Sequence, residues 1–315
     1  MKTNLIIDGN NLLYRTFHAN NKGGDPDDVV IGLCIHSALM TMNKLFRTFT
    51  PDDVIVVFDT TSWRKEYTKD LSLCVTNKKY KGYRRANQTP QQEQLFKMLD
   101  DHIDEFADML KDRTSVLVLR RELLEGDDLM AAYVQMNRDD ENIVVSGDKD
   151  MMQLLRYSGV RVINPADGKP RSLDDWGGNG DLFMFEKCIR GEPKANDNIQ
   201  SSYPRLLRTK IMKVLEDPFL CENIMNHTFS QLEELPDGSY GDVTYTTRDL
   251  FQENKILMDL REQPDVVKIL MVKTVIAARE SRGKYDHIKF LQFCTREELS
   301  NIINKVEEFV PMLSV

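Results

Sequence analysis

Acidic residues stand at the ends of four short apolar runs, where their carboxylates could bind metal ions. They are Asp8 after 5–7, Asp59 after 54–58, the group Glu125, Asp127 and Asp128 beyond 116–119, and Asp148 with Asp150 after 143–145. Crowded carboxylates repel one another, which raises their pKa values and destabilises a fold unless cations neutralise them. Oxygen ligands without His or Cys suit the hard cations Mg²⁺ and Mn²⁺. Seven carboxylates exceed the needs of one ion and predict two ions about 4 Å apart, an arrangement that serves phosphodiester cleavage.

Each acidic residue taken singly also has a structural interpretation. Asp8 with Gly9 and Asn10 is typical of a tight turn, whereas Asp127 and Asp148 are typical helix N-caps. Because 50 of the 315 residues are acidic, one such residue at a strand end means little. Four successive strand ends favour a metal site.

Positive charge is concentrated in two segments of an otherwise acidic chain of net charge −8. Residues 61–89 carry eight basic residues against two acidic ones, and residues 190–214 carry six against two. The overall charge argues against a protein that coats nucleic acid. Two interpretations of these basic islands stay open, namely solvated helix faces and contacts to a polyanion.

The apolar periodicity predicts strands and helices in alternation up to about residue 165. Strands are expected at 5–7, 54–58, 116–119, 143–145 and 160–163, and helices at 31–49, 95–110, 127–137 and 149–155. Near-continuous apolar strands separated by helices indicate an α/β fold with a mostly parallel central sheet and helices on both faces. The carboxyl ends of such strands lie at one edge, which would bring the acidic residues together.

A Gly- and Asp-rich stretch at 174–180 predicts a boundary near residue 180, with an α/β domain at 1–180 and a helical subdomain at 181–315. Helices are expected there at 182–189, 203–215, 266–279 and 297–309, with a hairpin at 238–245.

No apolar run approaches the roughly 18 residues of a membrane span, so we expect neither a transmembrane nor a secreted protein. Five scattered Cys without a CxxC pair predict reduced thiols in a cytoplasm, and neither Cys nor His supports a zinc site.

Several motifs resemble those of the PIN-like 5′-nuclease superfamily, the flap endonucleases and 5′→3′ exonucleases. They are LIIDGNNLLYR at 5–15, VVFD at 56–59, YKGYR at 80–84 with Arg64 upstream, EGDD at 125–128, SGDKD at 146–150, and a loop from Cys188 to Ile199 that resembles the helix–three-turn–helix element. Order and spacing agree across about 4–215. Within the superfamily, the third strand and the helical C-terminus most resemble the ribonuclease H group of T-even phages.

The resemblance implies roles for individual residues. Asp8, Asp59, Glu125, Asp128, Asp148 and Asp150 would hold two Mg²⁺ ions directly or through water, Asp127 would support one of them, and Asp197 would serve the second. Lys81 and Arg84 would contact the scissile phosphate from a helical arch at about 61–90, and Asp148 would be catalytic through its metal. The remaining substrate-binding residues would be Arg64, Lys78, Lys79, Tyr80, Tyr83 and Arg85 in the arch, and Lys194, Arg205, Arg208 and Lys210 along the duplex. For Tyr80 and Tyr83, stacking on bases and packing within the arch stay open.

The loop at 191–198 departs from the family pattern. Glu192 stands where the family has the first of two Asp, two residues are inserted before Asp197, and the glycine-rich turn after Asn198 is missing. The geometry of the second metal site and the presence of a monovalent-cation site are therefore open.

The implied enzyme removes RNA primers and adjacent DNA from RNA–DNA and DNA–DNA duplexes during replication of a phage. It would be a monomer in the host cytoplasm, with Mn²⁺ able to replace Mg²⁺, and with a phage single-strand-binding protein and a sliding clamp as partners. The segment 309–313 is either a contact for such a partner or a tail packed on the core.

Two alternatives belong to other functional classes. A HAD-type phosphatase needs a second Asp two residues after the first, where Asn10 stands, and a separate Lys motif. A non-catalytic DNA-binding relative would have lost metal ligands, yet the expected carboxylates are present apart from the change at Glu192.

Overall fold

The computed structural model describes residues 1–21, 27–70, 72–76, 79–81, 89–192, 199–203, 206, 208–235 and 238–315. Seven predicted site residues lie outside the described residues, namely Lys78, Tyr83, Arg84, Arg85, Lys194, Asp197 and Arg205. The chain forms two compact units: Met1–Thr60, Thr89–Arg171 and Lys268–Val315 make the first, and Thr61–Gln88 with Ser172–Val267 the second.

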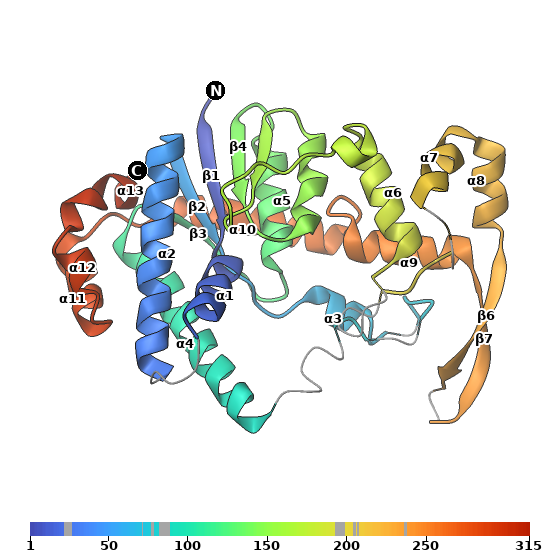
Figure 1. The fold of residues 1–315 in the computed structure, drawn as a ribbon, viewed down its shortest axis with the longest axis horizontal. Helices are drawn as coiled ribbons and strands as arrows, with labels where there is room; N and C mark the ends of the chain where they lie inside the picture. Colours follow the sequence, from blue (N-terminus) through green and yellow to red (C-terminus); the bar gives the residue numbers. More distant parts are fainter. Residues whose placement is uncertain are drawn as a thin grey trace. The chain divides into compact units, whose positions relative to one another are not determined.

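The first unit is built on a five-stranded sheet in which every pairing is parallel. Its strands are β1 (Thr3–Asp8), β2 (Asp53–Val57), β3 (Leu117–Leu119), β4 (Glu141–Val145) and β5 (Val160–Ile163). The spatial order β3-β2-β1-β4-β5 places β1 between β2 and β4 (Figure 1). The expected α/β fold with a parallel sheet is confirmed.

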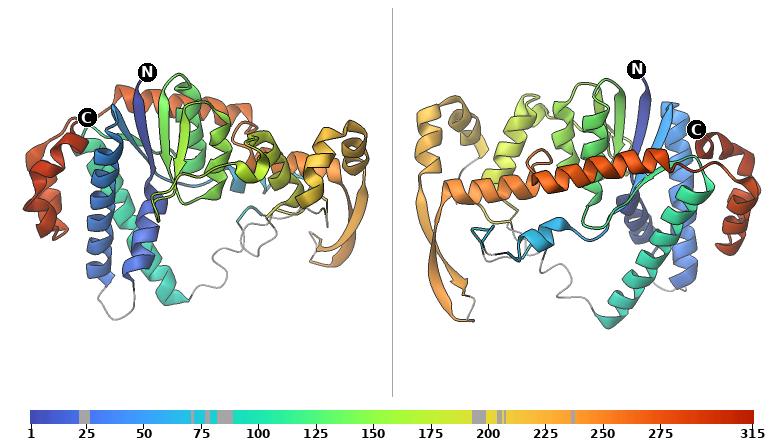
Figure 2. Two further views of the ribbon diagram at one scale, coloured as in Figure 1. Left: turned by 45° about the horizontal axis from the view of Figure 1, so that its top comes forward. Right: turned by 180° about the vertical axis from the view of Figure 1, so that it is seen from behind.

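Helices cover both faces of this sheet, because the central strands β1, β2 and β4 are apolar on both sides apart from their ends. The helices α1 (Gly9–Asn20), α2 (Asp27–Phe49) and α4 (Pro90–Arg113) pack on one face, and α5 (Gly126–Met136) packs on the other (Figure 2). The 3₁₀ helix η1 (Lys149–Arg156) follows β4. Helix α1 was not predicted, since its first residues were open to interpretation as a turn.

Helix α2 is unusually apolar for a helix of a sheet domain. Its segment Val29–Phe49 is long and apolar enough to cross a membrane by length and composition, contrary to the expectation from the sequence. Ile31, Ile35, Leu39 and Met42 on this helix are buried in the core that also contains the sheet residue Leu5. Core packing therefore accounts for the apolar composition of α2.

The last 48 residues belong to the first unit, which corrects the predicted assignment of 181–315 to one subdomain. They contain most of α10 (Asp265–Glu280), together with α11 (His287–Arg296), α12 (Ser300–Ile303), the 3₁₀ helix η3 (Val306–Glu308) and α13 (Val310–Leu313). Phe290, Phe309 and Met312 are fully buried in the same core as Leu5, so these helices close the sheet domain. The segment 309–313 is a packed tail. The helix expected at 297–309 is broken, and Glu298 has a positive φ of 55°.

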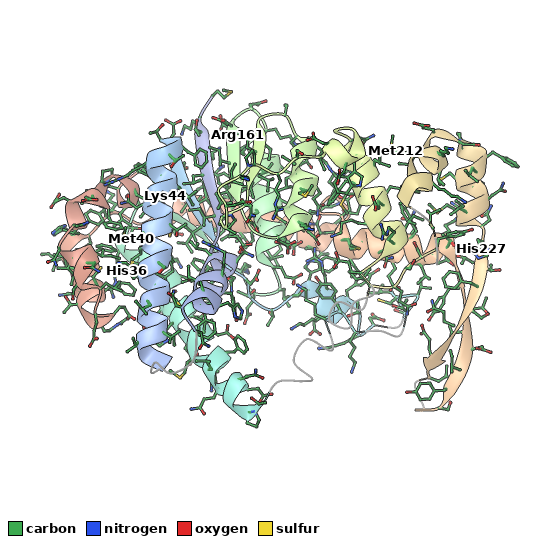
Figure 3. All side chains as sticks on the ribbon, viewed as in Figure 1. His36, Met40, Lys44, Arg161, Met212 and His227 are labelled. Atoms are coloured by element: carbon green, nitrogen blue, oxygen red, sulfur yellow. The ribbon has the colours of Figure 1, made fainter. Side chains whose placement is uncertain are left out.

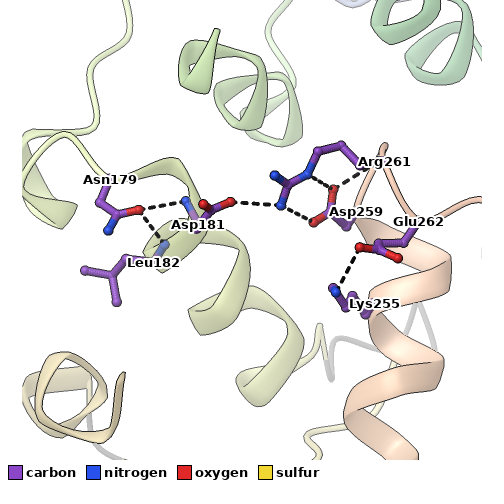
Figure 4. Close-up of polar contacts among 7 residues, drawn as sticks. All are labelled: Asn179, Asp181, Leu182, Lys255, Asp259, Arg261 and Glu262. Carbon is purple, nitrogen blue, oxygen red and sulfur yellow. Dashed lines mark hydrogen bonds and ion pairs between the residues drawn. The ribbon is translucent and has the colours of Figure 1, made fainter. Parts of the chain in front are cut away.

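The second unit contains α3 (Trp63–Tyr67), the 3₁₀ helix η2 (Asp174–Trp176), α6 (Gly180–Arg190), α7 (Arg208–Glu216), α8 (Pro218–Met225), α9 (Thr247–Met258) and a hairpin of β6 (Thr228–Glu234) with β7 (Tyr240–Thr246). Arg261 links α6 to the end of α9 through ion pairs to Asp181 at 2.8 Å and Asp259 at 3.1 Å (Figure 4). Helix α9 escaped prediction because it buries the polar residues Glu253 and Asn254, which disrupt its apolar stripe.

Candidate active site

The carboxyl ends of β1, β2 and β4 bring three acidic loops to one edge of the sheet. In the registers of these strands Asp8 lies opposite Val57, and Ile7 lies opposite Val145. Asp59 and Asp148 therefore follow the strands on either side of Asp8. The chain moves from β1 to β2 and β3 on one side and then to β4 and β5 on the other, and α/β sheets place their sites at such a switch point.

Asp8 joins the first loop to the loop after β4. Its Oδ1 accepts the N–H of Asn11 at 2.9 Å, so it is the N-cap of α1, and its Oδ2 accepts the Ser146 hydroxyl at 2.8 Å. The Ser146 oxygen also accepts the N–H of Asp148 at 3.1 Å. Asp148 in turn caps η1 by accepting the N–H of Asp150 at 2.8 Å. Asp148 is thus the expected N-cap, and Asp8, expected in a tight turn, is an N-cap as well. The N-cap expectation for Asp127 is wrong, because Glu125 is the N-cap of α5 and Asp127 lies in the first turn.

The loops after β2 and before α5 meet through Asp59. Its Oδ1 accepts the N–H of Gly126 at 2.5 Å, and a Cβ on Gly126 would lie 2.9 Å from that oxygen, so a larger residue there would displace the Asp59 carboxylate. Glu125 is the N-cap residue of α5, and its own N–H donates to Asp128 Oδ2 at 3.3 Å. Asp128 is fully buried beneath the helix start. This burial differs from the role of a metal ligand implied for it.

Asp127 lies at the electrostatic centre of the site. Burial raises the pKa of its carboxyl well above the usual range, and the charges of Asp148, Asp8, Asp59 and Glu125 raise it further, in that order. Burial, followed by the charge of Asp59, raises the pKa of Asp8 to about 7. The negative charges of four predicted site carboxylates therefore act on Asp127. Asp150 lies in the first turn of η1 and completes the acidic set.

This donor set fits a divalent cation, because positive charge at this edge would remove the repulsion that raises the two pKa values. Among the described residues, no three His, Cys, Asp or Glu side chains surround one point as ready-made ligands. Mg²⁺ is usually bound through one or two carboxylates and keeps several waters, which suits a looser arrangement. Asp8, Asp59, Asp127 and Asp148, with Glu125, would hold such ions in part through water.

Two asparagines of α1 hold the neighbouring loops, and sequence reasoning assigned them no role. Asn10 Oδ1 accepts the N–H of Asp59 at 2.8 Å, and Asn11 Oδ1 accepts the N–H of Gly147 at 2.9 Å. One helix start therefore fixes the acidic loops after β2 and β4. The signal in the sequence was the pair of amides directly after Asp8.

The basic residues at 61–81 lie in the second unit. Arg64 is 3% exposed, donates from Nε to the Leu257 carbonyl at 2.7 Å, and lies 4.6 Å from the Trp63 ring. This placement differs from the phosphate contact expected of it. The Nζ of Lys81 lies 4.9 Å from the ring of Tyr80, which favours packing for this tyrosine. Lys79 is exposed.

The loop that departs from the family pattern is described at both its ends. Glu192 forms an ion pair with Lys187 at 2.7 Å and a backbone bridge to Ile199. Gly191 has φ 60°, and a Cβ there would meet the Gln200 carbonyl at 2.3 Å, so the turn requires glycine. Lys210 is exposed on α7, which Arg208 begins, although the side chain of Arg208 lies outside the described set.

The strand order and the acidic edge define the PIN-like class of nucleases. A family model described as "5′-3′ exonuclease, N-terminal resolvase-like domain" matches residues 3–176, more than half of the chain. The chain belongs to this 5′→3′ exonuclease family, as its motifs predicted. No curated protein sequence matches it.

Three solved structures from bacteriophage T5 share the fold. The D15 protein co-crystallised with metal ions has a TM-score of 0.63 and 18% identity, with 88% of this chain and 99% of that chain covered. A variant of the D15 flap endonuclease in a pseudo-enzyme–product complex with DNA and metal ions has a TM-score of 0.62 and 19% identity, with 89% of this chain and 100% of that chain covered. The T5 5′-exonuclease with bound zinc has a TM-score of 0.62 and 19% identity, with 87% of this chain and 99% of that chain covered.

Proposed function

We propose that this chain is a divalent-metal-dependent 5′→3′ nuclease with exonuclease and flap-endonuclease activity on DNA–DNA and RNA–DNA duplexes. The convergence of Asp8, Asp59, Asp127 and Asp148 at the switch point of a sheet of this family carries the proposal. Together with Glu125, these residues would hold divalent ions, which when bound would supply an activated water and stabilisation of the charge on the attacking and leaving oxygens. Mg²⁺, with Mn²⁺ as a substitute, suits an all-oxygen site.

The D15 structure with DNA supports a nucleic-acid substrate for this chain. We extend the proposal to removal of RNA primers and adjacent DNA during phage replication, by a monomer in the host cytoplasm. A single-strand-binding protein and a sliding clamp are the proposed partners. The phosphatase alternative is not favoured, because Asn10 holds the Asp59 loop where that fold needs a second Asp.

The direct test compares a 5′-flap DNA, an RNA–DNA duplex with a 5′ end and p-nitrophenyl phosphate, each with and without MgCl₂. Metal-dependent release of 5′ nucleotides or flaps from the two nucleic acids supports the proposal. Release of p-nitrophenol alone would indicate a phosphatase. Tight DNA binding without cleavage in Mg²⁺ or Mn²⁺ would indicate a non-catalytic relative.

We predict that Asn11→Ala lowers the cleavage rate about 10- to 100-fold, because outer hydrogen bonds that orient metal ligands have effects of this size. The substitution removes the acceptor of the Gly147 N–H next to Asp148. Asn20→Ala on the same helix is the matched control, since it removes a bond to the Thr16 carbonyl far from the site. Both variants should lose about 1 kcal/mol of stability in thermal unfolding. Equal cleavage rates in the two variants would show that Asn11 serves the fold alone.

For the basic segment, we predict that Lys81→Ala lowers turnover about 10-fold or more with a smaller change in DNA affinity. A charge that meets the phosphate in the reacting geometry acts mainly on turnover. Lys79→Ala should mainly weaken binding and its salt dependence. Single-turnover cleavage and fluorescence anisotropy measure the two quantities separately. If both variants bind DNA more weakly but keep the native turnover, the segment attracts DNA by its charge and takes no part in cleavage.

A further inference from the structure

Arg171 lies at the acidic edge and has no part in the site described so far. The segment before it runs back along β5, with Pro170 bridged to Ile163, and the Arg171 N–H donates to the Val162 carbonyl at 2.7 Å. These backbone contacts fix the position of the Arg171 Cα beside β5. The guanidinium reaches the peptide that precedes Asp148, where Nη2 lies 3.4 Å from the Gly147 carbonyl oxygen.

The guanidinium of Arg171 is only weakly used by the protein. A distance of 3.4 Å is longer than an ordinary N–H···O bond. Its Nε is buried and has no hydrogen-bond partner among the described residues. The long contact of Nη2 therefore leaves terminal donors of the guanidinium that an anion could use.

We propose that Arg171 binds a backbone phosphate of the nucleic-acid strand beside Asp148, an inference that rests on the proposed function. A guanidinium keeps its charge and offers donors in a planar fork that matches two phosphate oxygens. The loops at this edge carry Asp8, Asp59, Asp127 and Asp148, with the exposed Lys149 beside Asp148, so an approaching polyanion gains from a further cation there besides the metal ions. The N–H of Gly147 is held by Asn11 at 2.9 Å, and the Arg171 guanidinium lies on the carbonyl side of the same residue at the longer distance of 3.4 Å. A phosphate on Arg171 would therefore be placed next to the Asp148 loop.

Arg161 provides a matched control within the same unit. It lies near the amino-terminal end of β5, at the opposite edge of the sheet from the acidic loops (Figure 3). Its guanidinium already forms an ion pair with Glu141 at 2.7 Å. Arg161→Gln removes the same charge from the chain as Arg171→Gln does, away from the site.

The experiment measures the affinity for a 5′-flap DNA by anisotropy at several salt concentrations with Mg²⁺ present, in an Asp148→Asn background that removes cleavage. We expect Arg171→Gln to weaken binding about 5- to 10-fold and to reduce the salt slope by about one phosphate contact, roughly 0.7–0.9. Arg171→Lys should keep the salt slope and recover part of the affinity. Arg161→Gln should change neither quantity.

Three results would overturn the inference. First, Arg171→Gln could match Arg161→Gln in affinity and salt slope. Second, it could lower only the thermal stability, which would mean that Arg171 stabilises the backbone at Gly147 and binds no phosphate. It could also slow cleavage in the otherwise native chain with an unchanged salt slope, which would mean that it positions Asp148 without a phosphate. Because binding is measured apart from cleavage, a native chain that binds flap DNA but does not cut it would refute the proposed function and leave the result for Arg171 standing.

Discussion

Replacing Asp148 with asparagine should lower the rate of nucleic-acid cleavage on the order of 10³-fold, the size of effect seen when a transition-state charge loses its stabilising group. Asparagine keeps the shape of the side chain and an oxygen that can accept the Asp150 N–H, so the loop should stay in place. What it loses is the negative charge that acts on Asp127 and that a metal ion needs. Single-turnover cleavage of a 5′-flap DNA at saturating Mg²⁺ measures the effect.

The same variant should bind DNA as well as the native chain or more tightly, and should unfold at a higher temperature without metal. Both expectations follow from the removal of one repulsive charge from the acidic edge. Asp167→Asn is the control, since Asp167 is exposed and accepts only a local N–H, that of Lys169. An unchanged cleavage rate in Asp148→Asn would refute the proposed metal site.

Without metal, the free energy of unfolding should fall as the pH rises from about 4 to about 7. In the folded protein Asp8 keeps its proton up to a pKa of about 7, whereas its ordinary value is 3.8. Between these values the folded state binds more protons than the unfolded state, so stability declines with rising pH. Asp127, with its pKa raised in the same direction, adds to the decline.

Saturating Mg²⁺ should reverse this trend, because the ion binds the ionised carboxylates of the folded state. At about 100 times its dissociation constant a bound ligand adds about 2.7 kcal/mol, which raises the melting temperature of a chain of this length by roughly 4 °C. The gain should be largest above pH 7 and small below pH 5, where protons compete. Thermal unfolding across this pH range with Mg²⁺ or EDTA provides the measurement. Asp127→Asn should flatten the metal-free profile, and a metal-induced gain that does not change with pH would contradict the assignment.

The sequence by itself determined the class of fold and the identity of most acidic residues of the site. The runs around Ile6, Ile55 and Val144 are apolar on both faces, which only a covered parallel sheet accommodates. Parallel strands end at one edge, so acidic residues at successive strand ends had to meet there, whatever the details of the helices. Local pattern was sufficient because the apolar period of each strand is a local property, and strands that are joined through helices run parallel.

Only the tertiary structure decided where several of these side chains lie. Arg64 belongs to a matching motif, yet its guanidinium is buried and donates to the carbonyl of Leu257, 193 residues away. Asn11 and Arg171 had no predicted role, yet they lie on the two sides of Gly147, 136 and 24 residues away from it in the sequence. The C-terminal helices likewise close the first core from the far end of the chain. Such contacts depend on how distant segments pack, and residue type and spacing carry no record of that packing.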